Sequence, residues 1–147
     1  MEKIQFSITI DAPKEKVWEA LWQDAHYRNW TSVFGEGSYA ITDNWKEGTK
    51  VLFLAADGGG MVSMVEANRP GEYMSFKHIG EMKDGVEDTS SEKIKEWAGS
   101  MENYTLTEED GKTTLDVDMG ITEAYKEFFI NTWPIALQKL KEIAEKK

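Results

Sequence analysis

The first ten residues alternate between apolar and polar side chains, which is the period of a strand with one buried face. The apolar residues are Ile4, Phe6, Ile8 and Ile10, and the polar residues between them are Gln5, Ser7 and Thr9. Two short amphipathic helices are predicted next, over residues 13–23 and 26–34. Asp11 is placed to cap the first of these helices, and Pro13 suits its first turn.

Strand patterns dominate the middle of the chain, and turn sequences such as Asp110-Gly111-Lys112 separate them. A polar, acidic segment at residues 81–95 interrupts the series. We predict that it forms a long excursion at the open end of the sheet, with one helical turn. At the mouth of a cavity it is also a candidate lid. The predicted strands cover residues 38–42, 49–55, 61–67, 73–79, 98–106 and 113–120.

Residues 123–146 have the apolar spacing of one long amphipathic helix. Thr122 is placed to cap this helix at its start. Pro134 removes one helical hydrogen bond and crowds the preceding turn, so a kink or a restart is predicted near Thr132. The apolar stripe of the helix consists of Tyr125, Phe129, Trp133, Ala136, Leu137, Leu140 and Ile143.

The order of these elements predicts an α+β protein with a single domain over residues 1–147. One long helix cannot cover both faces of a broad sheet. We therefore expect a curved antiparallel sheet of about six or seven strands that wraps around the C-terminal helix, with two short helices after the first strand. Such wrapping favours a cavity between the sheet and the long helix.

Three groups of motifs resemble those of one protein family. At the first strand–helix junction, Ile10-Asp11-Ala12-Pro13 precedes Val17-Trp18-Glu19-Ala20-Leu21. Farther along, Glu96-Trp97-Ala98-Gly99 leads into Glu102-Asn103-Tyr104-Thr105-Leu106. The last helix contains Thr132-Trp133-Pro134 with Ala136-Leu137 and Leu140-Lys141. In this order the motifs are similar to those of the START-like (SRPBCC) superfamily, in its branch named after the activator of a heat-shock chaperone's ATPase.

The resemblance implies a helix-grip domain with an internal cavity. Members of the superfamily include lipid carriers, plant hormone-binding and pathogenesis-related proteins, aromatic polyketide cyclases and co-chaperones. In the co-chaperone the activity depends on a second, N-terminal domain, which we do not expect in a chain of 147 residues. A chaperone partner is therefore kept as an alternative, and fold alone does not decide the function.

Composition excludes several classes of function. The formal net charge of −10 disfavours binding to nucleic acid or to anionic membrane surfaces. The absence of cysteine rules out disulfides, a thiol nucleophile and thiolate metal sites. No apolar stretch approaches the roughly 18 residues of a membrane span, and the start of the chain lacks the pattern of a secretory signal. We expect a cytoplasmic, monomeric protein without a metal or cofactor.

Groups able to carry chemistry are few. Of the two histidines, His26 is expected to be exposed or to act as a local cap. His78 continues the row of Met74 and Phe76 on the predicted cavity side, although a histidine bonded to solvent or backbone at a strand end is the favoured interpretation. Alternation places Glu102 on the inward face of its strand. It is either a polar anchor or acid/base for a ligand, or a residue turned outward at a bulge.

These patterns favour a binding module for a small hydrophobic or amphipathic molecule, held between the sheet and the last helix. One alternative is an enzyme of the cyclase or dehydratase kind that uses Glu102 or His78 as acid/base. Another is a chaperone-modulating interaction domain. Tryptophans are expected mainly in the core, with Trp133 the best placed to touch a ligand. The predicted pocket consists of Phe53, Met74, Phe76, His78, Glu102, Tyr104, Val117, Phe129, Trp133 and Leu137.

Overall fold

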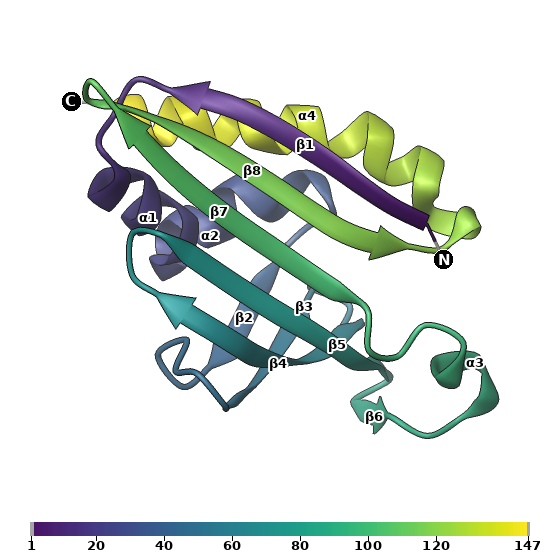
Figure 1. The fold of residues 1–147 in the computed structure, drawn as a ribbon. Helices are drawn as coiled ribbons and strands as arrows, with labels where there is room; N and C mark the ends of the chain where they lie inside the picture. The colour runs from purple at the N-terminus through teal and green to yellow at the C-terminus, as the bar shows by residue number, and fades with distance from the viewer. Residues whose placement is uncertain (1, 147) are drawn as a thin grey trace.

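An antiparallel sheet with the strand order β1-β8-β7-β5-β4-β3-β2 forms the framework of the protein (Figure 1). A short additional strand, β6, pairs with β5. The computed structural model describes residues 2–146. The strands are β1 (Glu2–Ile10), β2 (Tyr39–Thr42), β3 (Lys50–Leu54), β4 (Gly60–Arg69), β5 (Tyr73–Lys83), β6 (Val86–Asp88), β7 (Met101–Glu109) and β8 (Lys112–Ile121).

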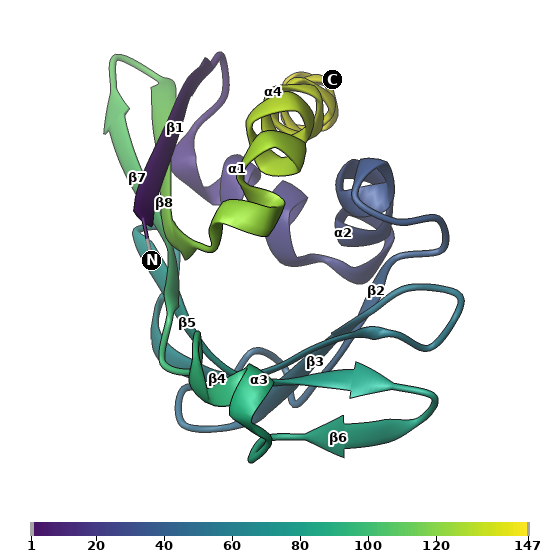
Figure 2. The same ribbon diagram turned by 90° about the vertical axis from the view of Figure 1, so that its right-hand side faces the viewer.

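Figure 2 shows the sheet curving around the helices that it holds on its concave side. The long helix α4 lies across β1 and also packs against α1 and α2. This arrangement confirms the predicted α+β helix-grip architecture, with eight strands rather than six or seven. The helices are α1 (Lys14–Trp22), α2 (Asp24–Trp30), a 3-10 turn (Thr31–Val33), α3 (Glu92–Lys95) and α4 (Glu123–Glu145).

The pairing of β7 with β8 determines which side chains face the helices. Tyr104 lies opposite Val117 and Leu106 opposite Leu115, and all four side chains are buried. Asp116 and Asp118 alternate with them and remain partly exposed. The four buried side chains therefore share the inner face of the hairpin, because opposed residues of an antiparallel pair lie on one face of the sheet.

Several local predictions at the helices were wrong. Pro13 itself occupies the N-cap position of α1, and neither this helix nor α4 has a side-chain cap, so Asp11 and Thr122 do not play the predicted role. No restart occurs at Thr132, because α4 continues through Pro134 as one helix. Tyr125, counted in the buried stripe, is 57% exposed. Burial of the stripe increases along the helix, since Phe129 is half-buried and Trp133 is almost fully buried.

The acidic segment at residues 81–95 contains more regular structure than predicted. β5 continues to Lys83 and pairs with β6, after which α3 supplies the expected single helical turn. The two elements project together at one end of the sheet (Figure 1). Ile94 of α3 is fully buried but lies outside the main core, so the excursion has an apolar anchor of its own.

Candidate ligand-binding site on the concave face

Four polar side chains form a continuous hydrogen-bonded set on the inner face of the sheet. Ser63 Oγ lies 2.6 Å from His78 Nδ1, and His78 Nε2 lies 3.2 Å from Glu102 Oε1. The hydroxyl of Tyr104 donates to Glu102 Oε2. When His78 is neutral and donates from Nε2 to the carboxylate, its Nδ1 can only accept the Ser63 hydroxyl proton.

Strand register brings these four residues together. Ser63 of β4 pairs with His78 of β5, where a register shift adds an extra residue to the ladder. On the other side of β5, Phe76 pairs with Glu102 of β7, which places the carboxylate on the row that His78 also occupies. Tyr104 follows two residues later on the same face. Because these contacts span three neighbouring strands, the sheet itself holds the set in place.

Solvent reaches part of this hydrogen-bonded polar set. Ser63 is fully buried, whereas the side chains of His78 and Glu102 are 10% and 20% exposed. Burial, together with the neighbouring Glu102 carboxylate, raises the pKa of Tyr104 well above its ordinary value. The same two causes raise the pKa of Tyr27. Both phenols therefore remain neutral hydrogen-bond donors over the physiological pH range, while Glu102 is the member that solvent reaches most.

Aromatic rings surround the polar set. The Phe76 ring lies 5.0 Å from that of Phe53 and 5.5 Å from that of Trp22, in edge-to-face contacts. Trp22 also packs 4.9 Å from Tyr104, and Trp133 of α4 lies 6.2 Å from Tyr104. Aromatic pairs of this kind stabilise a fold by more than the burial of their surface area alone. Two contacts join this aromatic cluster to the polar set: Tyr104 donates to Glu102, and the Phe53 ring lies 6.3 Å from that of His78.

The ten predicted pocket residues lie on the inner face of the sheet and on α4, and they differ in how deeply they are buried. The interior of the core contains most of them: Met74, Phe76, Tyr104, Val117, Trp133 and Leu137. His78 and Glu102 form the polar set, and Phe53 and Phe129 are only half-buried. Protein rings occupy much of the space between Trp133 and the sheet. Phe53, Glu102 and Phe129 each keep part of their surface open to solvent.

Two hollows in the described part of the chain lie away from this set. The larger, about 670 Å³, is open and lies beside α1, the start of α2 and the β2–β3 turn. The smaller, about 190 Å³, lies between β1 and α4 and includes Leu137 and Pro134 in its lining. The polar set therefore coincides with neither hollow, and a ligand there has to enter by moving half-buried side chains.

Ser63 was not predicted from the sequence. It lies in an apolar stretch with Val62 before it and Met64 after it, so alternation shows neither its direction nor its partner. His78 was expected to bond to solvent or backbone, and that interpretation was wrong, because both of its ring nitrogens bond to side chains. The interpretation of Glu102 as an outward residue at a bulge is excluded by its contacts with His78 and Tyr104.

The arrangement of Ser63, His78 and Glu102 resembles a hydroxyl–imidazole–carboxylate relay. Ser63 is inaccessible to solvent, so it cannot attack an external substrate in this conformation. The accessible member, Glu102, can accept a proton or a hydrogen bond from a bound molecule. On α4, the indole Nε1 of Trp133 is buried and has no hydrogen-bond partner among residues 2–146, so it is a donor without an acceptor.

Within residues 2–146, no three histidine, aspartate or glutamate side chains gather as a metal site would require. The helices of the same part of the chain include none with the length and apolar character needed to cross a bilayer.

Comparison with known proteins gives the fold. No protein-family model and no curated protein sequence matches the chain. Among solved structures, protein CV1439 from Chromobacterium violaceum aligns over the full length of both chains with a TM-score of 0.73 and 20% identity. The Aha1 dimer from Colwellia psychrerythraea gives a TM-score of 0.73 and 19% identity, over 99% of this chain and 97% of the other.

A third structure, DynU16 of the dynemicin biosynthetic locus, aligns with 99% of this chain at a TM-score of 0.70 and 17% identity. This chain spans about half of it, since 48% of DynU16 is covered. At these identities the likeness carries the architecture and not the activity. The chain has the helix-grip fold that CV1439, Aha1 and DynU16 share, which is the START-like fold.

Proposed function

We propose that the protein binds a small apolar molecule carrying a hydrogen-bond-donating group, such as a phenol or an alcohol, on the concave face of the sheet. The observation that carries the proposal is the partial exposure of Glu102, a carboxylate that is bonded to Tyr104 at the edge of an aromatic cluster. A partly buried carboxylate is costly to desolvate unless its oxygens are paired. Each oxygen of Glu102 has one protein partner, and each keeps a lone pair free for a ligand.

The charge of Glu102 sets the chemistry of the preferred ligand. A fatty-acid carboxylate would be repelled, whereas a ligand hydroxyl would donate to Glu102 in a charge-assisted bond. The body of the ligand would lie against Phe53 and Phe129, which are half-buried. Trp133 Nε1 supplies a donor on the helix side for an acceptor atom of the same molecule.

Calorimetric titration with 2-naphthol and with 2-methoxynaphthalene tests this proposal, because a methyl group replaces the donating hydrogen in the second probe. A charge-assisted hydrogen bond of about 1.5–3 kcal/mol corresponds to a preference of roughly tenfold or more for 2-naphthol. Glu102→Gln keeps the side-chain size and should reduce that preference to about threefold or less. The matched control is Glu109→Gln, on the exposed end of the same strand. Equal affinity of the wild-type protein for both probes, or no binding of either, would refute the proposal.

Acid–base catalysis is the second candidate function, favoured by the convergence of His78, Glu102 and Tyr104 at one place. Glu102 would remove a proton next to a carbonyl group, and the neutral Tyr104 phenol would stay hydrogen-bonded to it. Deuterium exchange at the activated carbon of 2-tetralone, followed by NMR, measures this step. Exchange that is faster with the wild-type protein than with Glu102→Gln supports catalysis, and identical rates exclude it for this class of substrate.

A further inference from the structure

The larger hollow has a lining that the proposed function does not use. It opens between α1, the start of α2, and β2 with its turn toward β3, and its volume is about 670 Å³. This lies within the range of roughly 300–1,000 Å³ that small-molecule sites occupy. Two kinds of side chain dominate its wall, namely the indoles of Trp18, Trp22 and Trp45 and the carboxylates of Glu15, Glu19 and Asp24.

The three indoles form a connected aromatic wall. The rings of Trp18 and Trp22 lie 6.0 Å apart in an edge-to-face arrangement, and those of Trp22 and Trp45 lie 5.0 Å apart and tilted. Trp22 is almost fully buried, and its Nε1 has no hydrogen-bond partner among residues 2–146. Trp18 and Trp45 are half-buried, so parts of both rings are open to a molecule in the hollow.

Trp45 is held in place by its backbone and by hydrogen bonds. Asn44 and Trp45 have φ values of 53° and 58°, a region that residues with side chains rarely adopt and that costs free energy. The Trp45 amide donates to Thr42 Oγ1 at 2.9 Å, and its indole Nε1 donates to the carbonyl oxygen of Trp22 at 3.0 Å. The ring is therefore positioned before any ligand arrives, which reduces the entropy lost on binding.

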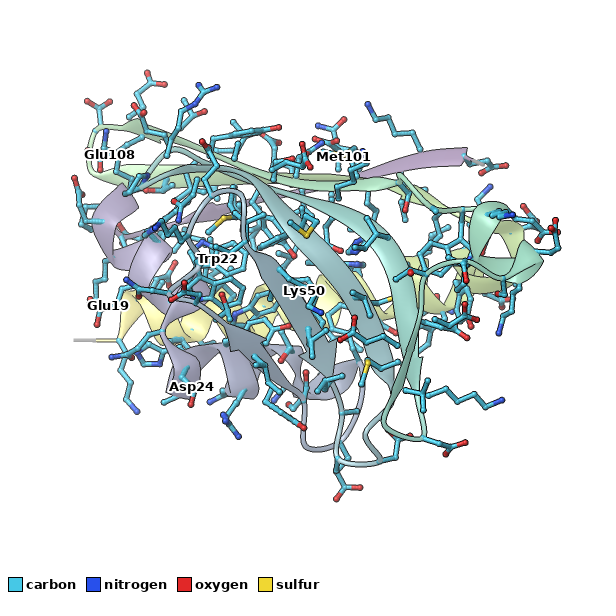
Figure 3. The ribbon with its side chains drawn as sticks, turned by 90° about the horizontal axis from the view of Figure 1, so that it is seen from below. Glu19, Trp22, Asp24, Lys50, Met101 and Glu108 are labelled. Atoms are coloured by element: carbon cyan, nitrogen blue, oxygen red, sulfur yellow. The ribbon has the colours of Figure 1, made fainter. Side chains whose placement is uncertain are left out.

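Negative charge lines the opening of the hollow. Glu15 and Glu19 are exposed, stand one helical turn apart on α1, and form no ion pair within residues 2–146. Asp24 forms an ion pair with Arg28, whose Nε lies 2.9 Å from Asp24 Oδ2. Among residues 2–146, no lysine or arginine contributes to the lining. In Figure 3, Glu19, Trp22 and Asp24 lie toward the same side of the molecule.

We propose that this hollow binds a small organic cation, specifically a free molecule with a trimethylammonium group. The faces of indole rings attract cations, and tryptophan does so more strongly than tyrosine or phenylalanine. A quaternary ammonium group has no N–H to donate, so aromatic faces and nearby carboxylates satisfy it better than hydrogen-bond acceptors do. The acidic rim and the formal net charge of −10 add long-range attraction for a cation.

This site is separate from the one on the concave face and does not rest on it. The rings of Trp22 and Trp45 stand between the two: Trp22 contacts Trp18 on the side of the hollow and Tyr104 on the side of the core, and Trp45 contacts Phe53 and Phe76 on the core side. An alkylammonium compound would thus bind on the far side of Trp22 from Glu102. Binding there leaves the hydrogen bonds of Glu102 with His78 and Tyr104 unchanged.

Choline and 3,3-dimethylbutan-1-ol are suitable probes, since they have the same shape and differ in charge. Titrations followed by NMR should show choline binding about tenfold more tightly than the neutral alcohol, with the amide and indole signals of Trp18 and Trp45 shifting most. Added salt should weaken choline binding and leave the alcohol unaffected. Equal binding of both compounds, or choline-dependent shifts confined to other residues, would overturn the proposal.

Two sets of variants separate the roles of rings and charges. Trp18→Leu should reduce choline affinity at least fivefold, whereas Trp97→Leu, which removes a half-buried indole elsewhere, should not change it. If Trp18→Leu does not fold, the double substitution Glu15→Gln/Glu19→Gln still tests the site, because both side chains are exposed. Its control is Glu123→Gln/Glu127→Gln, an exposed pair with the same spacing on α4.

The double substitution on α1 should lower choline affinity severalfold, and the pair on α4 should leave it unchanged. The reverse result, or equal losses from both pairs, would show that only the overall charge matters and would overturn the assignment. The protein could also sediment with phosphatidylcholine vesicles and yet fail to bind free choline. That result would overturn the proposal, because the preferred partner would then be a membrane headgroup.

Discussion

The hydrogen bond from Tyr104 to Glu102 provides a quantitative test of the inner polar set. Glu102→Leu removes the acceptor and leaves a buried phenol hydroxyl without a partner. An orphaned buried donor costs about 1–3 kcal/mol, and His78 loses its partner as well. We therefore expect Glu102→Leu to lower the free energy of unfolding by about 2–3 kcal/mol. Tyr104→Phe removes the donor instead and leaves Glu102 with solvent and His78, so it should cost about 1 kcal/mol.

In the background of Tyr104→Phe there is no hydroxyl left to orphan. The further cost of Glu102→Leu should therefore fall to about 1 kcal/mol, which gives a coupling free energy of about 1.5 kcal/mol between the two residues. Urea unfolding of the four proteins, followed by tryptophan fluorescence, measures every term of this cycle. The slope of the free energy against urea must stay constant across them.

Additive effects within about 0.3 kcal/mol would refute this reasoning, because independent sites show such additivity. The same result would remove the basis for treating Glu102 as an inward, hydrogen-bonded anchor. A matched cycle on the outer face, Asn103→Ala with Asp118→Ala, removes a 2.9 Å hydrogen bond between partly exposed side chains. We expect its coupling to be below about 1 kcal/mol, because solvent replaces the lost partner.

Further predictions concern the core, the phenols and the excursion. Phe76→Ala should lower the free energy of unfolding by about 3–5 kcal/mol, whereas Phe128→Ala, at a side chain 44% exposed, should change it far less in the same urea titration. Burial raises the pKa of Tyr27 and Tyr104 in the folded state, so stability is fully present below the unfolded value of about 10 and falls as the pH rises above it. Absorbance at 295 nm should therefore show both phenols ionising only as the protein unfolds in alkali, and an ionisation of either in the folded protein would contradict their burial. Gly80→Ala would place a Cβ 2.3 Å from the carbonyl oxygen of Asp88, so it should separate β6 from β5 and speed hydrogen exchange in β6; unchanged exchange there would contradict this close approach.

The architecture was predictable because its main signals are local. Alternation along β1 and β8, and the helical spacing of Trp133, Leu137 and Leu140, depend only on which side of each element faces the core. These patterns define the inner faces without knowledge of which strands are neighbours. The curved sheet around α4 then follows from the need to cover one face of a broad sheet with a single long helix.

The site was less predictable because it depends on contacts across strands. Met74, Phe76 and His78 were assigned correctly to one row, but the pairing of His78 with Ser63 requires a register shift that alternation does not reveal. Gly80 hid the continuation of β5, since a residue without a side chain carries no apolar or polar signal. It is required there because the backbone of β6 approaches so closely.

The hollow beside α1 shows a different limit of prediction from the sequence. Trp18 and Trp45 were expected in the core, and each is indeed half-buried against it. Trp45 lies where the left-handed backbone of Asn44 and Trp45 turns the chain, and nothing in the local pattern marks that conformation. Aromatic residues in a sequence therefore indicate burial well, but they do not show which rings also border an opening.

The central claim is that Glu102 anchors a small molecule on the concave face. Native mass spectrometry of the protein purified from its own host under non-denaturing conditions tests it most directly. Wild-type protein and Glu109→Gln should each carry an additional small-molecule mass, and Glu102→Gln should carry much less of it. Masses equal to the bare chain in all three proteins, or equal retention by Glu102→Gln and the wild type, would contradict the claim.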